Sequence, residues 1–209
     1  MAQNRSHAVM AQRAEPHDSL DFFPTPPWAT RALCEWLVAP ELLSIHQRDA
    51  WEPACADGCM ARPLAEYFRS VAASDVHDYG FGEVADFLWP TDRRADWIVT
   101  NPPFRLGQQF AETALERARH GVALLVRTAF LESADRHAAL FCRRPPSDIL
   151  QFVERVPMFK GRLDPKGSTA TAYCWLVWRF DRERSDTRFH WLAPCHKRLE
   201  RAGDYPVAE

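Results

Sequence analysis

The sequence lacks the features that mark membrane-bound and exported proteins. Among its 209 residues, no apolar run approaches the roughly 20 that a membrane-spanning helix requires. The run at 121–126, for example, has six residues. The first 20 residues hold no apolar segment of the kind found in a signal peptide. We therefore expect a cytoplasmic protein that has no membrane partner.

Cysteine and glycine patterns also exclude several kinds of site. The six cysteines form no CxxC pair, and Cys55 and Cys59 have no matching Cys or His pair downstream, so no metal site is predicted. Neither GxGxxG nor GxxxxGK(S/T) occurs, which argues against a Rossmann dehydrogenase and against phosphoryl transfer. The eight histidines are scattered, and none lies beside a plausible nucleophile.

Lysine is scarce. Of 26 basic residues, only Lys160, Lys166 and Lys197 are lysines. The others are arginines, which suit bidentate contact with phosphate and stacking on planar groups, although a coding bias produces the same composition. Because the formal net charge is −2, any nucleic-acid surface must be a local patch.

Length and composition suit a single α/β domain with a full core. Residues 1–20 are polar and aperiodic, so we expect a flexible leader. The proline-rich stretch 21–27 (DFFPTPP) is expected to be extended and to open the domain, which runs over 21–180. From residue 181 the chain is charged, and a short surface tail over 181–209 is expected.

Apolar periodicity places alternating helices and strands along the domain. Helices are predicted over 29–38, 60–68, 108–119 and 131–142, and strands over 49–54, 70–75, 96–101, 121–127, 149–156 and 173–180. This alternation predicts a mostly parallel sheet with helices on both faces. The last two strands, joined by the loop 157–171 with no helix between them, are predicted to form an antiparallel edge pair.

The strongest local signal follows the apolar strand at 96–101. Asn101, Pro102, Pro103 and Phe104 lie where ligands bind in open α/β sheets, at the carboxyl end of a strand. A carboxamide oxygen and a backbone carbonyl aimed the same way can accept both hydrogens of one exocyclic amine. The aromatic ring can stack on a planar base. These four residues are the candidate catalytic residues.

The NPPF motif resembles the catalytic motif (D/N/S)PP(Y/F/W) of S-adenosylmethionine-dependent DNA amino-methyltransferases, in particular phage-type N6-adenine enzymes. Residues 52–58 (EPACADG) resemble the family's first glycine loop, with Ala56 at the first glycine position. The resemblance implies a Rossmann-like class I methyltransferase fold and S-adenosylmethionine as cofactor. Because the cofactor motifs precede the catalytic motif, it also implies a gamma-like motif order.

The same resemblance implies which residues hold the cofactor. Glu52 would meet the methionine amino group, Asp75 the ribose hydroxyls, with Asp78 as a rival, and Asp86 and Phe87 the adenine end. Residues 23–26 (FPTP) would close over the methionine end. The implied cofactor-binding residues are Phe23, Pro24, Thr25, Glu52, Pro53, Ala54, Asp57, Gly58, Asp75, Asp86, Phe87 and Asn101.

The implied substrate is double-stranded DNA with a flipped-out adenine, bound by Phe104 and by the basic loop residues Phe159, Lys160 and Arg162. Only about thirty residues follow the last predicted strand, so a specificity partner is an open alternative to recognition by loop 157–171. RNA adenine and protein glutamine are alternative substrates. An inactive methyltransferase-like binding subunit is also open, because Ala56 replaces a glycine. A restriction-modification setting fits the motifs, and oligomeric state is not predicted.

Overall fold

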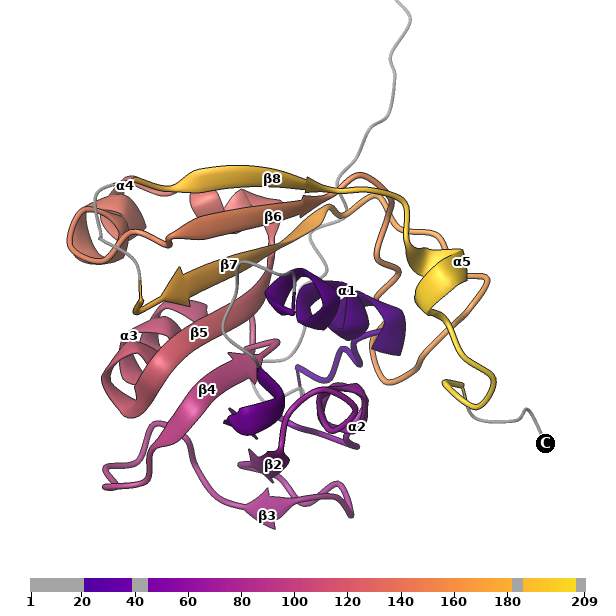
Figure 1. Ribbon diagram of the computed structural model, residues 1–209, viewed down its shortest axis with the longest axis horizontal. Helices are drawn as coiled ribbons and strands as arrows, with labels where there is room; N and C mark the ends of the chain where they lie inside the picture. Colours follow the sequence, from indigo (N-terminus) through magenta and orange to yellow (C-terminus); the bar gives the residue numbers. More distant parts are fainter. Residues whose placement is uncertain (1–20, 39–44, 182–185, 206–209) are drawn as a thin grey trace, which may run out of the picture.

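The computed structural model describes residues 21–38, 45–181 and 186–205. Within these ranges eight strands form one sheet in the order β3-β2-β1-β4-β5-β7-β6-β8. Figure 1 shows the sheet with β3 at the bottom and β8 at the top. The strands are β1 Asp49–Glu52, β2 Ser70–Asp75, β3 Glu83–Val84, β4 Ala95–Thr100, β5 Ala118–Arg127, β6 Asp148–Phe152, β7 Tyr173–Arg179 and β8 Arg188–Leu192.

One strand of the sheet is reversed. β7 pairs antiparallel with β5 and with β6, and the other neighbouring pairs are parallel. The predicted fold class, a mostly parallel sheet with an antiparallel pair, is confirmed. The pair is not at the edge, however, because β8 adds to the outer side of β6.

Helices cover both faces of the sheet, as predicted. On one face α1 Pro27–Leu37 packs against α2 Ala61–Leu64 and α5 His196–Leu199. On the other face lie α3 Gly107–Arg117, α4 Ala134–Arg136 and the π-helical turn η3 His137–Phe141. Alternation along β4 supplies both cores, since Trp97 and Val99 face α1 and Ile98 faces α3.

Two predicted helices are shorter than expected. The helix predicted over 60–68 ends at Leu64, where the amides of Glu66 and Tyr67 turn back to carbonyls only three residues earlier. The helix predicted over 131–142 begins only at residue 134, because the Ser133 side chain caps it by accepting from the Arg136 amide. It then continues as the π-helical turn.

The predicted surface tail is wrong for residues 188–199. β8 extends the sheet, and α5 buries Leu199 and Cys195 in the core beside α1. A buried ion-pair cluster fixes the following residues, because the Arg31 guanidinium bonds both carboxylate oxygens of Asp204, at 2.7 and 2.8 Å. The predicted leader, residues 1–20, lies outside the described residues. No helix in the described part of the chain is long and apolar enough to cross a membrane.

Candidate active site

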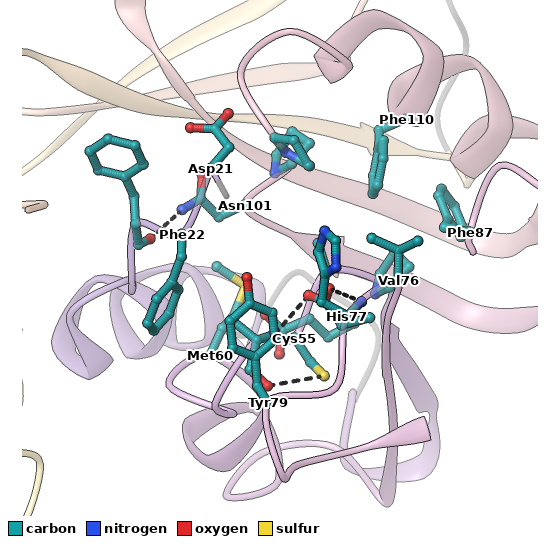
Figure 2. Close-up of a pocket in the computed structure, with 18 of the residues that line it drawn as sticks. Asp21, Phe22, Cys55, Met60, Val76, His77, Tyr79, Phe87, Asn101 and Phe110 are labelled. Atoms are coloured by element: carbon teal, nitrogen blue, oxygen red, sulfur yellow. Dashed lines mark hydrogen bonds between the residues drawn. The ribbon is translucent and has the colours of Figure 1, made fainter. Parts of the chain in front are cut away.

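A cavity of about 540 Å³ opens at the carboxyl ends of β1, β2 and β4. The strand order reverses between β1 and β4, and ligands of open α/β sheets bind at such a switch point. Glu52 ends β1, Asp75 ends β2, and Asn101 follows β4, so neighbouring strands bring all three to the cavity. Figure 2 shows Asn101 and Asp21 at one end of the cavity, with Phe87 and Phe110 at the other.

The turn after β1 approaches the cavity through an unusual backbone conformation. Ala56 has φ +44°, in the left-handed region that glycine occupies at little cost, so it adopts the conformation expected of the glycine it replaces. Gly58 has φ +87° and lies outside the cavity lining. A Cβ there would stand 2.7 Å from the Phe81 ring, so Gly58 allows close packing of the turn.

Glu52 is a buried carboxylate without a full set of partners. It is 2% exposed, and its Oε2 has no hydrogen-bond partner among the described residues. Burial raises the pKa of Glu52 well above its ordinary value, and the charges of Asp75 and Asp57 add to this effect. A buried acceptor beside two other carboxylates forms a site suited to a cationic group.

Asp75 is held by the turns on either side of it. Its Oδ2 accepts from the Ala56 amide and its Oδ1 from the His77 amide, both at 3.0 Å. Each carboxylate oxygen has a second lone pair, so the carboxylate can still accept from a ligand hydroxyl. Asp78, the alternative residue for the ribose hydroxyls, does not line the cavity. Its Oδ1 accepts from the Gly80 amide at 2.8 Å.

The far end of the cavity is aromatic. Phe87 is 2% exposed and packs its ring edge-on against Trp51 at 5.1 Å and tilted against Phe110 at 5.0 Å between centroids. The neighbouring Asp86 is exposed, and its Oδ1 accepts from the Leu88 amide at 2.8 Å. An apolar wall with a carboxylate beside it suits a flat heterocycle that carries an N–H donor.

The Asn101 carboxamide has a defined orientation. Its Nδ2 donates to the Phe23 carbonyl and to the Thr25 hydroxyl, each at 3.1 Å. A carbonyl only accepts, so the amide nitrogen must face Phe23. The Oδ1 atom is therefore on the other side, where it is buried and has no partner among the described residues. The site thus presents, at the candidate catalytic motif, an acceptor with no partner among the described residues.

The segment 21–25 crosses over the NPPF motif. Asp21 Oδ2 accepts from the Phe104 amide at 2.6 Å, and the Phe23 and Phe104 rings pack 5.0 Å apart with their planes tilted by 49°. The guanidinium of Arg127 also lies over the Phe104 ring, and its central carbon is 3.6 Å from the ring centroid. Both the segment 21–25 and the end of β5 therefore contact the candidate catalytic motif.

The three predicted loop residues lie outside the cavity lining: Phe159, Lys160 and Arg162. Phe159 is half-buried against Gly167 of its own loop, and the Arg162 guanidinium lies 5.4 Å from its ring. The loop nevertheless reaches the site, because the Gly161 amide donates to the Phe22 carbonyl at 2.9 Å. A substrate-binding role for these residues stays a prediction.

Except for Gly58, the other predicted site residues line the cavity, together with several that sequence reasoning missed. The missed residues are Asp21, Phe22, Cys55, Ala56, Cys59, Met60, Val76, His77, Tyr79, Leu88, Leu106 and Phe110. Their positions beside the motifs were the only available signal.

Burial raises the pKa of the Cys55 thiol to about 12 and also raises that of Cys59, so both are neutral thiols near pH 7 and poor nucleophiles. Within the described residues no His, Cys, Asp and Glu cluster fits a metal ion.

These features can be tested against S-adenosylmethionine. The unpartnered Glu52 Oε2 matches an ammonium group, Asp75 matches a pair of hydroxyls, and the wall around Phe87 matches an adenine ring. The three features follow one another across adjacent strands, in the order in which the cofactor's groups are connected. The residues present therefore fit this cofactor.

Several solved structures with a similar fold are named as methyltransferases. A protein from Pyrococcus horikoshii named as an RNA methyltransferase aligns with a TM-score of 0.59 at 15% identity, over 79% of this chain and 90% of its own. A modification subunit named for a type I restriction enzyme, from Vibrio vulnificus, aligns with a TM-score of 0.58 at 15% identity. The chain has the Rossmann-like methyltransferase fold.

These similarities are of fold, since the identities are low. The human methyltransferase 10 domain containing protein aligns with a TM-score of 0.50 at 11% identity, over 75% of this chain and 83% of its own. The Vibrio vulnificus alignment covers 90% of this chain, which spans 50% of that subunit. No protein-family model and no curated protein matches the chain.

Proposed function

We propose that the protein is an S-adenosylmethionine-dependent methyltransferase that methylates the N6 amine of adenine in DNA. One observation carries the proposal: the catalytic motif holds a buried acceptor, Asn101 Oδ1, that has no partner among the described residues. It lines the same cavity as the Glu52 carboxylate, which suits the cofactor's cation. A cofactor site and an amine-accepting group therefore share one cavity.

The cofactor-binding residues would each contact a different part of the molecule. When bound, S-adenosylmethionine supplies a methyl group activated on a sulfonium. Glu52 would pair with the ammonium, Asp75 would accept from the ribose hydroxyls, and Phe87 would pack on the adenine ring. Asp86, which is exposed beside Phe87, would accept from the adenine amine. This assignment rests on the fit of the lining and on the motif resemblance.

The acceptor amine would be held by two oxygens. An adenine amine is a weak nucleophile, because its lone pair is delocalised into the ring. Asn101 Oδ1 and the Pro102 carbonyl would accept one N–H each, which favours a tetrahedral nitrogen and stabilises the positive charge that develops on it. Because the Asn101 amide is already anchored at Nδ2, little reorganisation accompanies the reaction.

DNA adenine is preferred over the alternatives because of the motif set. The Gly161 amide donates to the carbonyl of Phe22, which lines the cavity, so the neighbouring Lys160 and Arg162 would meet phosphates of a nucleic acid bound there. The NPPF motif alone is compatible with RNA adenine and protein glutamine. A target in duplex DNA would have to flip out of the helix to reach the cavity.

The proposal is tested by product analysis. The protein is incubated with labelled S-adenosylmethionine and unmethylated duplex DNA, with RNA in a parallel reaction, and the nucleosides are identified after digestion. We expect N6-methyladenine in DNA, lost in Asn101→Ala. Gln108→Ala is the matched control, because it removes a carboxamide that bonds Glu112 on α3, outside the cavity lining.

Other outcomes assign the other functions. Methylated RNA without methylated DNA would move the assignment to an RNA enzyme. Cofactor binding without any methylated nucleoside would overturn the proposal. It would favour a protein substrate, or a binding subunit that depends on a partner for specificity.

A further inference from the structure

The end of β5 reaches the candidate catalytic motif from the neighbouring strand. β4 and β5 pair in parallel, with Thr100 opposite Leu124, so Arg127 at the end of β5 lies beside the NPPF residues that follow Thr100. Its guanidinium carbon is 3.6 Å from the centroid of the Phe104 ring. This distance corresponds to a planar cation lying over the face of the ring.

Arg127 and Phe23 both contact Phe104, but they are held very differently. The Phe23 carbonyl accepts from Asn101, and its segment is also tied at Asp21, to the Phe104 amide, and at Phe22, to the loop. Arg127 is exposed, and besides lying over Phe104 it shares a side-chain hydrogen bond with the buried Tyr173, which is not part of the Asn101 anchor. Arg127 is therefore the neighbour that can leave the ring without disturbing the Asn101 carboxamide.

We propose that Arg127 is an acceptor-binding residue, which leaves the Phe104 ring when a target base stacks there and binds a backbone phosphate of the same nucleic acid. The inference rests on the proposed function and narrows its substrate class. The guanidinium is planar, as a base is, and its N–H fork fits two phosphate oxygens. A base and the guanidinium compete for one ring face, whereas a phosphate and the guanidinium attract each other.

The nearest alternative is a permanent structural role for the cation on Phe104. The carboxylate close to this motif, Asp21, already accepts from the Phe104 amide at 2.6 Å. A solvent-exposed cation over the ring of Phe104, which lines the cavity, favours a polyanionic acceptor over a neutral glutamine side chain. Arg127 therefore bears on the choice between nucleic acid and protein as substrate.

The first measurement follows the position of Arg127 directly. Stacking on Phe104 should shift the Arg127 Nε–H proton upfield by the ring current, and the signal is assigned by its loss in Arg127→Lys. A mixed-sequence 30-base-pair duplex is titrated with the cofactor product present. We expect the upfield shift to disappear with the duplex and to persist with a glutamine-containing peptide. A signal that keeps its shift at saturating duplex overturns the proposal.

The second measurement uses the salt dependence of the reaction to test whether Arg127 contacts a phosphate. The value of kcat/KM for unmethylated plasmid DNA is measured against salt concentration for wild type and Arg127→Met. The variant keeps an aliphatic chain over the ring but loses the charge. We expect kcat/KM at 0.1 M salt to fall about tenfold, and the log–log salt slope to lose about 0.9. Arg188→Met, at an exposed arginine of β8, is the control and should keep the wild-type slope.

The two proposals fail differently. Wild-type methylation of DNA with the same salt slope in Arg127→Met overturns the role of Arg127 and leaves the proposed function standing. No methylation of nucleic acid by wild type overturns both.

Discussion

At the scale of single residues, the orientation of the Asn101 carboxamide decides what the candidate catalytic motif can bind. The motif resemblance implies that Thr25 contacts the cofactor. In the structure, the Thr25 hydroxyl accepts a hydrogen bond from the Asn101 Nδ2 atom at 3.1 Å. Thr25 is 3% exposed, so this contact is shielded from water. The hydroxyl and the Phe23 carbonyl together leave Asn101 Oδ1 free to accept from a substrate.

We expect Thr25→Val to lower kcat about tenfold, because a methyl group replaces the hydroxyl and one anchor of the Asn101 amide is lost. Thr25→Ser keeps the hydroxyl and should retain most of kcat. The affinity for S-adenosylmethionine, measured by calorimetry, is compared for the same two variants. A loss confined to cofactor affinity in Thr25→Val would contradict this role and support the predicted cofactor contact.

Glu52 is a second residue whose environment leads to a measurable prediction. Its pKa is raised in the folded protein by burial and by the charges of Asp75 and Asp57, so the folded state binds a proton more tightly than the unfolded state. The ionised carboxylate therefore destabilises the fold as pH rises above about 4.3, the ordinary glutamate pKa. Glu52→Gln removes this penalty.

We expect Glu52→Gln to raise the free energy of unfolding by about 1–3 kcal/mol at pH 7.5, with a smaller gain at pH 5. Urea denaturation at both pH values measures it. The same variant should bind S-adenosylmethionine more weakly, and wild-type affinity should fall as pH falls through the raised pKa of Glu52. Equal free energies of unfolding of wild type and Glu52→Gln at pH 7.5 would show that the buried Glu52 carboxylate does not destabilise the fold.

At the scale of secondary-structure elements, residues 188–199 are part of the sheet and of the core. β8 pairs with β6 along five residues, and α5 places Leu199, 5% exposed, against α1. The Arg31 guanidinium in α1 joins this end of the chain to the centre through Asp204 and Glu66. Burial by itself lowers the pKa of Arg31, but the hydrogen bonds to Asp204 and Glu66 raise it by more. The pKa of Arg31 is therefore raised, and the guanidinium stays charged.

We therefore expect Leu199→Ala to lower the free energy of unfolding by about 2–5 kcal/mol, as for a buried leucine. Lys197→Ala, at an exposed position of the same short helix, should change it by less than about 0.5 kcal/mol. Urea unfolding followed by circular dichroism compares the two. Similar small effects at both positions would mean that α5 is a detachable surface segment, as the charge pattern suggested.

At the scale of the whole molecule, cofactor binding and folding are linked. A ligand that binds only the folded state at 100 times its Kd adds about 2.7 kcal/mol of stability. For a chain of this size, each kcal/mol corresponds to about 2–4 °C in Tm. S-adenosylmethionine should therefore raise Tm by about 5–11 °C in a thermal scan. Methylthioadenosine, which lacks the ammonium that Glu52 would meet, should raise it less, and an equal shift would argue against the Glu52 assignment.

The motifs and most elements were predictable because their signals are local. Apolar alternation marked the strands that end at Glu52, Asp75 and Thr100, and the prolines of NPPF limit the backbone wherever they occur. β8 was missed because its short alternating pattern, RFHWL, is embedded in a charged segment. An edge strand is stabilised by pairing with its neighbour, and that pairing is not visible along the chain.

The sequence by itself determined the fold class, the order of the motifs and the approximate positions of six strands, since each depends on neighbours within a few positions. Only the tertiary structure decided how these residues are paired. Thr25 meets Asn101 across 76 positions, and Asp21 meets Phe104 across 83. Arg127 covers Phe104 because two parallel strands end side by side. Such contacts depend on the order of the strands in the sheet and on which side chains pack on the same surface. Local periodicity along the chain predicts neither.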